Sequence, residues 1–258
     1  MHLLSLLLVT LAAALGGAIN SIAGGGTLLT FPAIVALGVP PLVANATSTV
    51  ALWPAALGSL WGYRQELEGA RSWVVRFTLP SLLGGGLGAW LLLHTSARHF
   101  DQIVPFLVLG ATLLFLVQGP IMRRVKVGTP ADAPGEPAAP AWLFVGYQLG
   151  VGVYGGYFGA GIGILMLAVL GPMGLSNIHR MNGLKNWGGM CMNAVAAAMF
   201  AASGIVNWPV ALAMAVGGLL GGYGGSRLAQ RVGQEPVRRA ITVIGFAAFA
   251  WLLIWARQ

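Results

Sequence analysis

Two glycine-rich strings contain the residue types and spacing best suited to binding a small ligand. The first, NSIAGGGTLLTFP at 20–32, holds Asn20, Gly24, Gly25, Gly26 and Thr27, and the second, YGGYFGAGIG at 154–163, holds Gly159 and Gly161. Three consecutive glycines would break an apolar helix, and broken backbone at membrane depth is tolerated only where protein or a water-filled cavity satisfies it. A helix that restarts at Thr27 would point free N–H groups and the positive end of its dipole at the break, which is typical of an anion site. The alternative is that these glycines only allow close helix packing.

A second pair of strings places polar side chains near the beginning of apolar runs. VPPLVANATSTVALWP at 39–54 contributes Asn45, Thr47 and Ser48, and NIHRMNGLKNWGG at 177–189 contributes Asn182 and Lys185. Such side chains can cap a helix, or they can line the same cavity as the glycine-rich strings. Lys185 can extend to the membrane interface or face a pore. The sequence leaves both alternatives open.

The residue types missing from the apolar runs limit the chemistry. All six acidic residues lie in expected loops or at the ends of apolar runs, so we expect no carboxylate at the membrane midplane. Cation sites and acidic proton relays need such groups, and their absence favours an anionic substrate. The four histidines also lie at the edges, and Cys191 is the single cysteine. We therefore expect no metal site and no cofactor.

The composition indicates a protein that lies in lipid. Residues of the set AVILMFWYC make up 57% of the chain, charged residues make up 8%, and the mean hydropathy is +0.80. The net charge of +8 does not point to nucleic acid, because the basic residues separate apolar runs instead of forming a soluble domain. The apolar start MHLLSLLLVTLAAALGG resembles a signal peptide, but it has no basic beginning, so we expect it to stay in the mature protein.

Apolar runs along the chain predict an all-α polytopic membrane protein. The runs are 3–22, 27–38, 42–63, 73–93 and 102–118, followed by 142–158, 162–175, 186–206, 208–226 and 237–255. Residues 119–141 between them carry several prolines and most of the local charge, which indicates an exposed linker. The chain therefore divides into a first membrane repeat at 1–118, a cytoplasmic linker at 119–141 and a second membrane repeat at 142–258.

The two halves resemble each other at an offset of 135 residues. This offset aligns Gly17 with Gly152, Gly24 with Gly159, Gly26 with Gly161, Trp73 with Trp208, Gly86 with Gly221 and Gly110 with Gly245. A further shift of two residues places Asn182 on Asn45 and Lys185 on Ser48. The agreement predicts a duplication in which each half has a Gly-broken first helix and three further spans.

The basic residues favour inverted repeats over parallel ones. If 3–22 and 27–38 together return the chain to its starting side, twelve of the 14 Lys and Arg residues fall on the cytoplasmic side. Only Arg98 and Arg257 fall outside. If the same residues cross the membrane once, the basic residues divide equally. The charges leave open whether 3–38 forms a reentrant hairpin or two spans.

The string GGAINSIAGGGTLLTFPAIVALGVPPLVANATSTVA at 16–51 resembles the signature of the TauE/SafE family, the sulfite and organosulfonate exporter-like permeases. In that pattern a Gly-rich stretch precedes L-x-x-P and A-x-x-T-S segments. Residues 152–186 resemble a weaker second copy, in which 180–185 depart from the family's A-N-A-x-K-like element. The resemblance covers nearly the whole chain. It implies export of sulfur-containing anions without nucleotide hydrolysis in the same chain.

These observations together predict a secondary transporter of the inner cell membrane that moves a small anion by alternating access. An anion channel, and a membrane enzyme or subunit of sulfur metabolism that uses Cys191, remain as alternatives. The expected partners are the small anion and membrane lipid, and a homo-oligomer remains open.

Overall fold

The computed structural model describes residues 3–124, 141–170, 173, 175, 177–229 and 234–255, and within these residues it contains ten α-helices, one 3-10 helix and no strands. The first half comprises α1 (Leu3–Ile22), α2 (Thr27–Val35), α3 (Pro41–Gly62), η1 (Arg64–Leu67), α4 (Arg71–Leu93) and α5 (Ala97–Arg124). The second half comprises α6 (Ala141–Tyr157), α7 (Ile162–Leu170), α8 (Ile178–Ser203), α9 (Trp208–Ala229) and α10 (Gln234–Trp255). Each predicted apolar run corresponds to one helix, so the all-α prediction is confirmed.

Two helices extend beyond their predicted apolar runs. α8 begins eight residues early, because Asn177 caps it: its side-chain oxygen accepts hydrogen bonds from the backbone N–H of His179 at 2.9 Å and of Arg180 at 3.2 Å. α5 continues to Arg124, into the segment predicted as linker. Residues 125–140, which make up most of that linker, lie outside the described residues. The division into repeats and linker therefore stays a prediction.

Four helices are long and apolar enough to cross a membrane, among the residues that the structure describes. They are Leu3–Ile22, Arg71–Leu93, Ala97–Val117 and Glu235–Ile254. Their outward surfaces carry exposed leucines such as Leu7, Leu11 and Leu83. Exposed apolar side chains of this number are stable when they face lipid and not water.

Glycines let the two halves approach each other closely. Along α9, a Cβ on Gly221 would lie 1.9 Å from the Ala14 carbonyl oxygen, and a Cβ on Gly225 would lie 2.4 Å from Ala18 Cα of α1. α4 and α6 pack in the same way, since a Cβ on Gly88 would lie 2.1 Å from the carbonyl oxygen of Val153. Glycine spacing of four residues is typical of close membrane helix pairs. The helix pairs α1–α9 and α4–α6 therefore hold the halves together.

The contacts also show the relative direction of neighbouring helices. α3 and α9 run in the same direction, because Gly58 faces Leu219 and Gly62 faces Ser226 farther along both helices. α3 and α8 run in opposite directions. Gly183, near the start of α8, faces η1 at Leu67, whereas Asn207, just after α8 ends, donates its backbone N–H to Thr47 near the start of α3.

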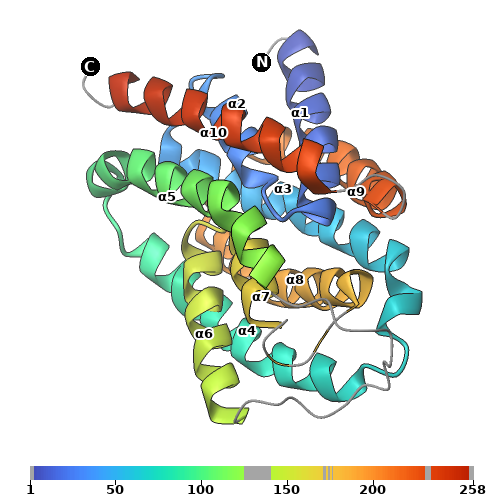
Figure 1. Cartoon of the computed structure of the whole chain (residues 1–258). Coiled ribbons are helices and arrows are strands. Elements are labelled where there is room, and N and C mark those ends of the chain that lie inside the picture. Colours follow the sequence, from blue (N-terminus) through green and yellow to red (C-terminus); the bar gives the residue numbers. More distant parts are fainter. Residues whose placement is uncertain are drawn as a thin grey trace.

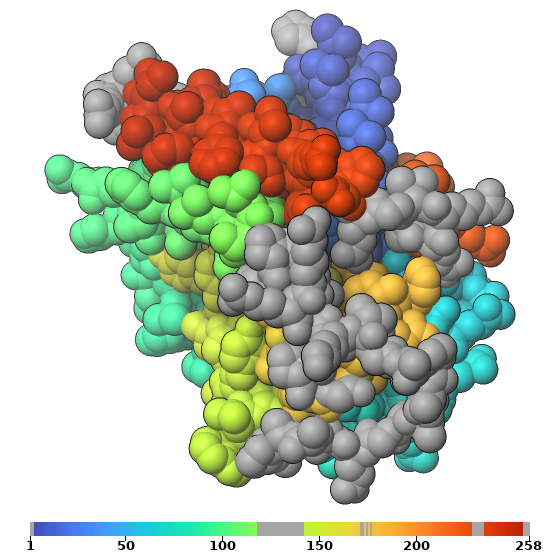
Figure 2. Space-filling view, viewed as in Figure 1, coloured from blue at the N-terminus to red at the C-terminus, as the bar shows by residue number. Residues whose placement is uncertain are grey.

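α3 and α8 lie in the middle of the bundle, and the other helices surround them (Figure 1). Figure 2 shows α10 lying along α5 across one face of the molecule. Two buried clusters fill the interior. The first cluster includes Phe31, Phe100, Phe158 and Phe200, and the second includes Trp73, Phe77 and Phe144.

Candidate functional site

The two glycine-rich strings form breaks between consecutive helices, as predicted. The first break separates α1 from α2, and the second separates α6 from α7. Gly24 and Gly159 occupy equivalent positions in the two breaks and both have positive φ, 82° and 81°. The breaks meet at the centre of the bundle, where a Cβ on Gly24 would lie 2.7 Å from the Cα of Gly163. Only glycine at both 24 and 163 allows the two backbones to approach this closely.

Each break is capped by a side chain from the other half of the chain. Lys185 on α8 is 2% exposed, and its ammonium donates to the last carbonyl oxygens of α1, at 3.0 Å to Ser21 and at 3.4 Å to both Asn20 and Ile22. Asn45 on α3 donates its side-chain N–H to the carbonyl oxygen of Tyr157, the last residue of α6, at 2.9 Å. Cations and N–H donors stabilise the negative end of a helix dipole.

A narrow cavity lies beside the first break. Its described lining residues are Asn20, Gly24, Ala56, Ile162, Gly163, Met166, Lys185, Asn186, Gly189 and Asn193. The empty space between them is about 290 Å³, but the walls are so close that it holds about one water molecule. The cavity therefore has to widen before a larger ligand can bind.

The polar side chains that line the cavity are one lysine and three asparagines, and none of the described lining residues is a carboxylate. The ammonium of Lys185 supplies the one charge among these residues. The side-chain nitrogen of Asn186 is buried and has no hydrogen-bond partner among the described residues. A buried donor without a partner costs free energy, which a ligand oxygen would recover. The start of α7, at Ile162 and Gly163, adds the positive end of a helix dipole.

The structure brings three predicted site residues together at this cavity: Asn20, Gly24 and Lys185. A helix does restart at Thr27, as predicted, but the helix start among the described lining residues of the cavity is that of α7. Gly25 instead faces the ring of Phe115, whose Cζ would lie 2.3 Å from an added Cβ, and Gly26 packs against the backbone of Gly16.

The remaining predicted site residues lie outside the described lining of the cavity. Thr47 accepts a hydrogen bond from the backbone N–H of Asn207 at 3.0 Å, and Ser48 shares one with Thr30 at 2.7 Å. Asn45 caps α6. Thr27, Gly159, Gly161 and Asn182 also lie elsewhere. A transporter changes conformation as it works, so a role of these residues in ligand binding stays a prediction.

Sequence reasoning missed most of the α8 wall of the cavity. Asn186, Gly189 and Asn193 follow one another at spacings of three and four residues, which places them on one face of a helix. The available signal was two asparagines, seven residues apart, inside one apolar run. Residues 186–206 were predicted only as a span, so this polar face was missed.

Comparisons with known proteins identify the family of the chain. A family model described as "Sulfite exporter TauE/SafE" matches residues 9–252. The chain is 30% identical over 249 residues to "Probable membrane transporter protein YfcA" of Escherichia coli strain K12, covering 93% of this chain and 87% of that protein. It is 28% identical over 236 residues to a "Probable membrane transporter protein" of Haemophilus influenzae, covering 88% and 86%. It is also 28% identical over 258 residues to "Probable membrane transporter protein ORF9" of Sinorhizobium sp, covering 98% and 93%.

The family model spans both breaks, both capping residues and every described residue of the cavity. Each match covers most of the relative's own length, and each relative is named as a probable membrane transporter. The resemblance noted in the sequence is thereby confirmed: the chain is a multi-pass membrane protein that belongs to the TauE/SafE family.

Proposed function

We propose that this protein is a secondary transporter that exports a small sulfur-containing anion, such as sulfite or an organosulfonate, across the inner cell membrane. The observation that carries the proposal is the central cavity. It combines the Lys185 ammonium with the unpartnered N–H of Asn186 and has no carboxylate among its described lining residues. The oxygens of sulfite and of a sulfonate group are hydrogen-bond acceptors with negative charge, so they complement such a wall.

The description of the family model, a sulfite exporter, supports the sulfur-containing class. It also supports the outward direction. The names of the relatives give no substrate, so sulfite and sulfonates belong to the proposal.

Transport requires the cavity to open alternately to the two sides of the membrane. The ammonium of Lys185 already donates to three carbonyl oxygens of α1, and a bound anion would compete with them for it. Loss of that cap would weaken the hold of α8 on the end of α1. Anion binding and movement at the first break are therefore coupled through one side chain.

Inverted repeats would provide the two alternating states. The opposite directions of α3 and its sequence counterpart α8 support this arrangement. The cavity residues lie toward the end of α3 that precedes Arg64 of η1 and toward the start of α8, which carries Arg180. The charge distribution predicts that these ends face the cytoplasm. The first buried cluster, with Phe31 and Phe158 in edge-to-face contact at 5.7 Å, fills the interior on the other side. We infer a nearly closed state whose cavity faces the cytoplasm.

The deciding experiment is binding and flux of sulfite, sulfate, thiosulfate and sulfonates with purified protein in liposomes. Asn186→Asp places a carboxylate in the cavity and should lower anion affinity tenfold or more, since a lost charge-assisted hydrogen bond is worth about 1.5–3 kcal/mol. Gln65→Glu adds the same charge at an exposed position of η1 and serves as the matched control. Equal anion affinity in Asn186→Asp and the parent protein would show that the anion does not bind in this cavity.

The same preparation separates the two alternative functions. A channel would show flux that does not saturate with anion concentration. An enzyme that uses a thiol would lose activity on Cys191→Ser, whereas we expect unchanged transport, because Cys191 is 3% exposed and is not among the described lining residues of the cavity.

A further inference from the structure

An apolar groove lies on the surface of the bundle between α3 and α9. Its described lining residues are Leu57, Gly58, Trp61, Leu219, Leu220 and Tyr223, and the empty space between them is about 640 Å³. Trp61 and Leu220 are 63% and 68% exposed. Since none of these residues lines the central cavity, the groove is a separate feature of the molecule.

Two arginines stand at one end of the groove. The guanidinium of Arg64 lies 5.0 Å from the ring centre of Trp61, and that of Arg227 lies 5.2 Å from the ring centre of Tyr223. Because Gly62 faces Ser226, α3 and α9 bring the two arginines to the same end. The rings that form the groove therefore also hold the two cations by cation–π contact.

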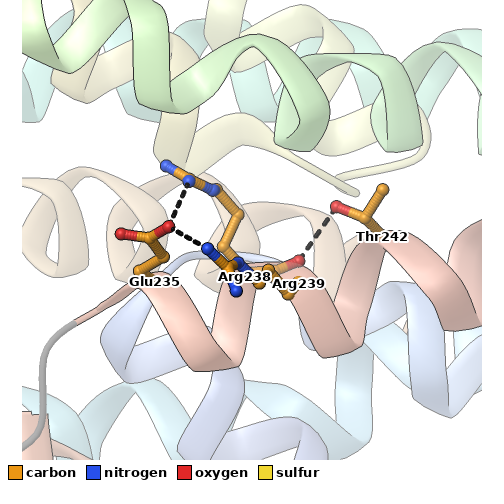
Figure 3. Close-up of polar contacts among 4 residues, drawn as sticks. All are labelled: Glu235, Arg238, Arg239 and Thr242. Atoms are coloured by element: carbon orange, nitrogen blue, oxygen red, sulfur yellow. Dashed lines mark hydrogen bonds and ion pairs between the residues drawn. The ribbon is translucent and has the colours of Figure 1, made fainter.

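Neither arginine has a carboxylate partner among the described residues. The ion pairs among the described residues join two other arginines, Arg238 and Arg239 of α10, to Glu235 (Figure 3). The distance from Arg239 to Glu235 is 2.6 Å. Arg64 donates one bond to the carbonyl oxygen of Trp61, at 2.8 Å, and is otherwise exposed. A guanidinium carries five N–H donors in a planar fork that suits a phosphate.

We propose that this groove binds an anionic glycerophospholipid of the surrounding membrane. An acyl chain lies against the apolar wall, and the phosphate contacts Arg64 and Arg227. Zwitterionic lipids bind less well, because their amine or choline group meets two like charges. A second apolar groove accepts lipids without this preference, because no arginine is described in contact with its rings; it is lined by Phe106, Leu107, Gly110, Leu114, Tyr154 and Leu165.

Native mass spectrometry of the purified protein tests the proposal with phosphatidylglycerol and phosphatidylcholine of equal chain length. The parent protein should retain phosphatidylglycerol preferentially. The double variant Arg64→Gln, Arg227→Gln should lose this preference by about tenfold or more, since each basic residue near a membrane surface strengthens the binding of anionic lipid about fivefold. Arg239→Gln removes a cation that is already paired and should keep the preference.

Other occupants give different results. Competition by glycerol 1-phosphate alone would assign the arginines to a free phosphate compound rather than to a lipid. A lipid-free dimer that dissociates in the double variant would assign the groove to a second copy of the chain. Either result, or an unchanged preference in the double variant, would overturn the lipid proposal. Anion flux need not change in any of these variants, so the test does not depend on the proposed transport function.

Discussion

Lys185 has a role that the sequence did not predict, because it caps α1 as well as lining the cavity. Its ammonium neither reaches the membrane interface nor stands free in a pore: it lines the cavity and caps α1 in the same position. A lysine that merely faced a pore would be costly to insert, and its removal would leave stability unchanged or raised. The cap reverses this expectation, because removing the ammonium takes a donor away from the buried carbonyl oxygen of Ser21 and a positive charge away from the end of α1.

We therefore predict that Lys185→Met lowers both anion affinity and stability. Affinity should fall tenfold or more through loss of the charge, and the free energy of unfolding should fall by about 1–3 kcal/mol through loss of the cap. Isothermal titration with the preferred anion and thermal melting in detergent measure the two effects. A variant with the parent's melting temperature would contradict the capping role.

Asn45→Leu provides the matched comparison for Lys185→Met. This substitution removes the cap of α6 and leaves the described lining residues of the cavity unchanged. The melting temperature should therefore fall, whereas the anion affinity should stay within about twofold of the parent protein's. An equally large loss of affinity in both variants would mean that the caps act on binding only by holding the breaks in shape.

At the scale of single residues, the sequence predicted the breaks better than their surroundings. Three glycines in a row predict a broken helix, because glycine weakens a helix at its own position, whatever packs around it. Which residues face the break depends on how α7 and α8 pack against α1, and a single sequence contains no measure of that distance. In the described state Gly25 faces Phe115 and Thr47 contacts Asn207, so their expected place in ligand binding stays a prediction.

At the scale of helices, the spacing of glycines decides which surfaces meet. Gly217, Gly221 and Gly225 of α9 all face α1, where an added Cβ would meet Thr10, Ala14 and Ala18. Gly224 lies beside them but has no atom within 4 Å of an added Cβ. This contrast separates the cost of contact from the general effect of replacing glycine in a helix.

We predict that Gly221→Val destabilises the protein by about 1–3 kcal/mol or more, because the α1–α9 pair must separate to admit the side chain. Gly224→Ala should leave the melting temperature unchanged or slightly raised, since alanine is the better helix former. The two melting curves, recorded in one detergent, check the prediction. Similar losses in both variants would show that contact with α1 is not the cause.

The ends of a helix could be predicted where an apolar run has clear limits. They were missed where polar residues at the end of a run are also helical. The start of α8 was placed eight residues late, because NIHRMNGL is typical of a loop by composition. It is helical because Asn177 caps the first turn, and because Arg180 donates to the backbone carbonyl oxygen of Glu66 at 3.2 Å. Tertiary contacts of this kind override composition.

At the scale of the whole molecule, inverted halves make a prediction that parallel halves do not. Gln65, between α3 and α4, and Ala202, at the end of α8, lie in equivalent places of the two halves and are both exposed. In a Cys191→Ser background, a cysteine at 65 should react with impermeant thiol reagents only from the cytoplasm. A cysteine at 202 should react only from outside. Reaction of both from one side would support parallel repeats.

In the proposed mechanism, the single cation among the described lining residues of the central cavity links transport to the membrane potential. With Lys185 protonated, the cavity carries one positive charge when empty and none when it holds a monoanion. A potential that is negative inside therefore acts mainly on the empty carrier. The potential favours the state in which the empty site faces the cytoplasm. The free-energy difference is up to roughly 2.3 kcal/mol per 100 mV if the charge crosses the whole membrane. We expect anion efflux from liposomes to speed up when valinomycin and potassium set the interior negative, with the voltage acting on the return step. Lys185→Met should lose most of this dependence.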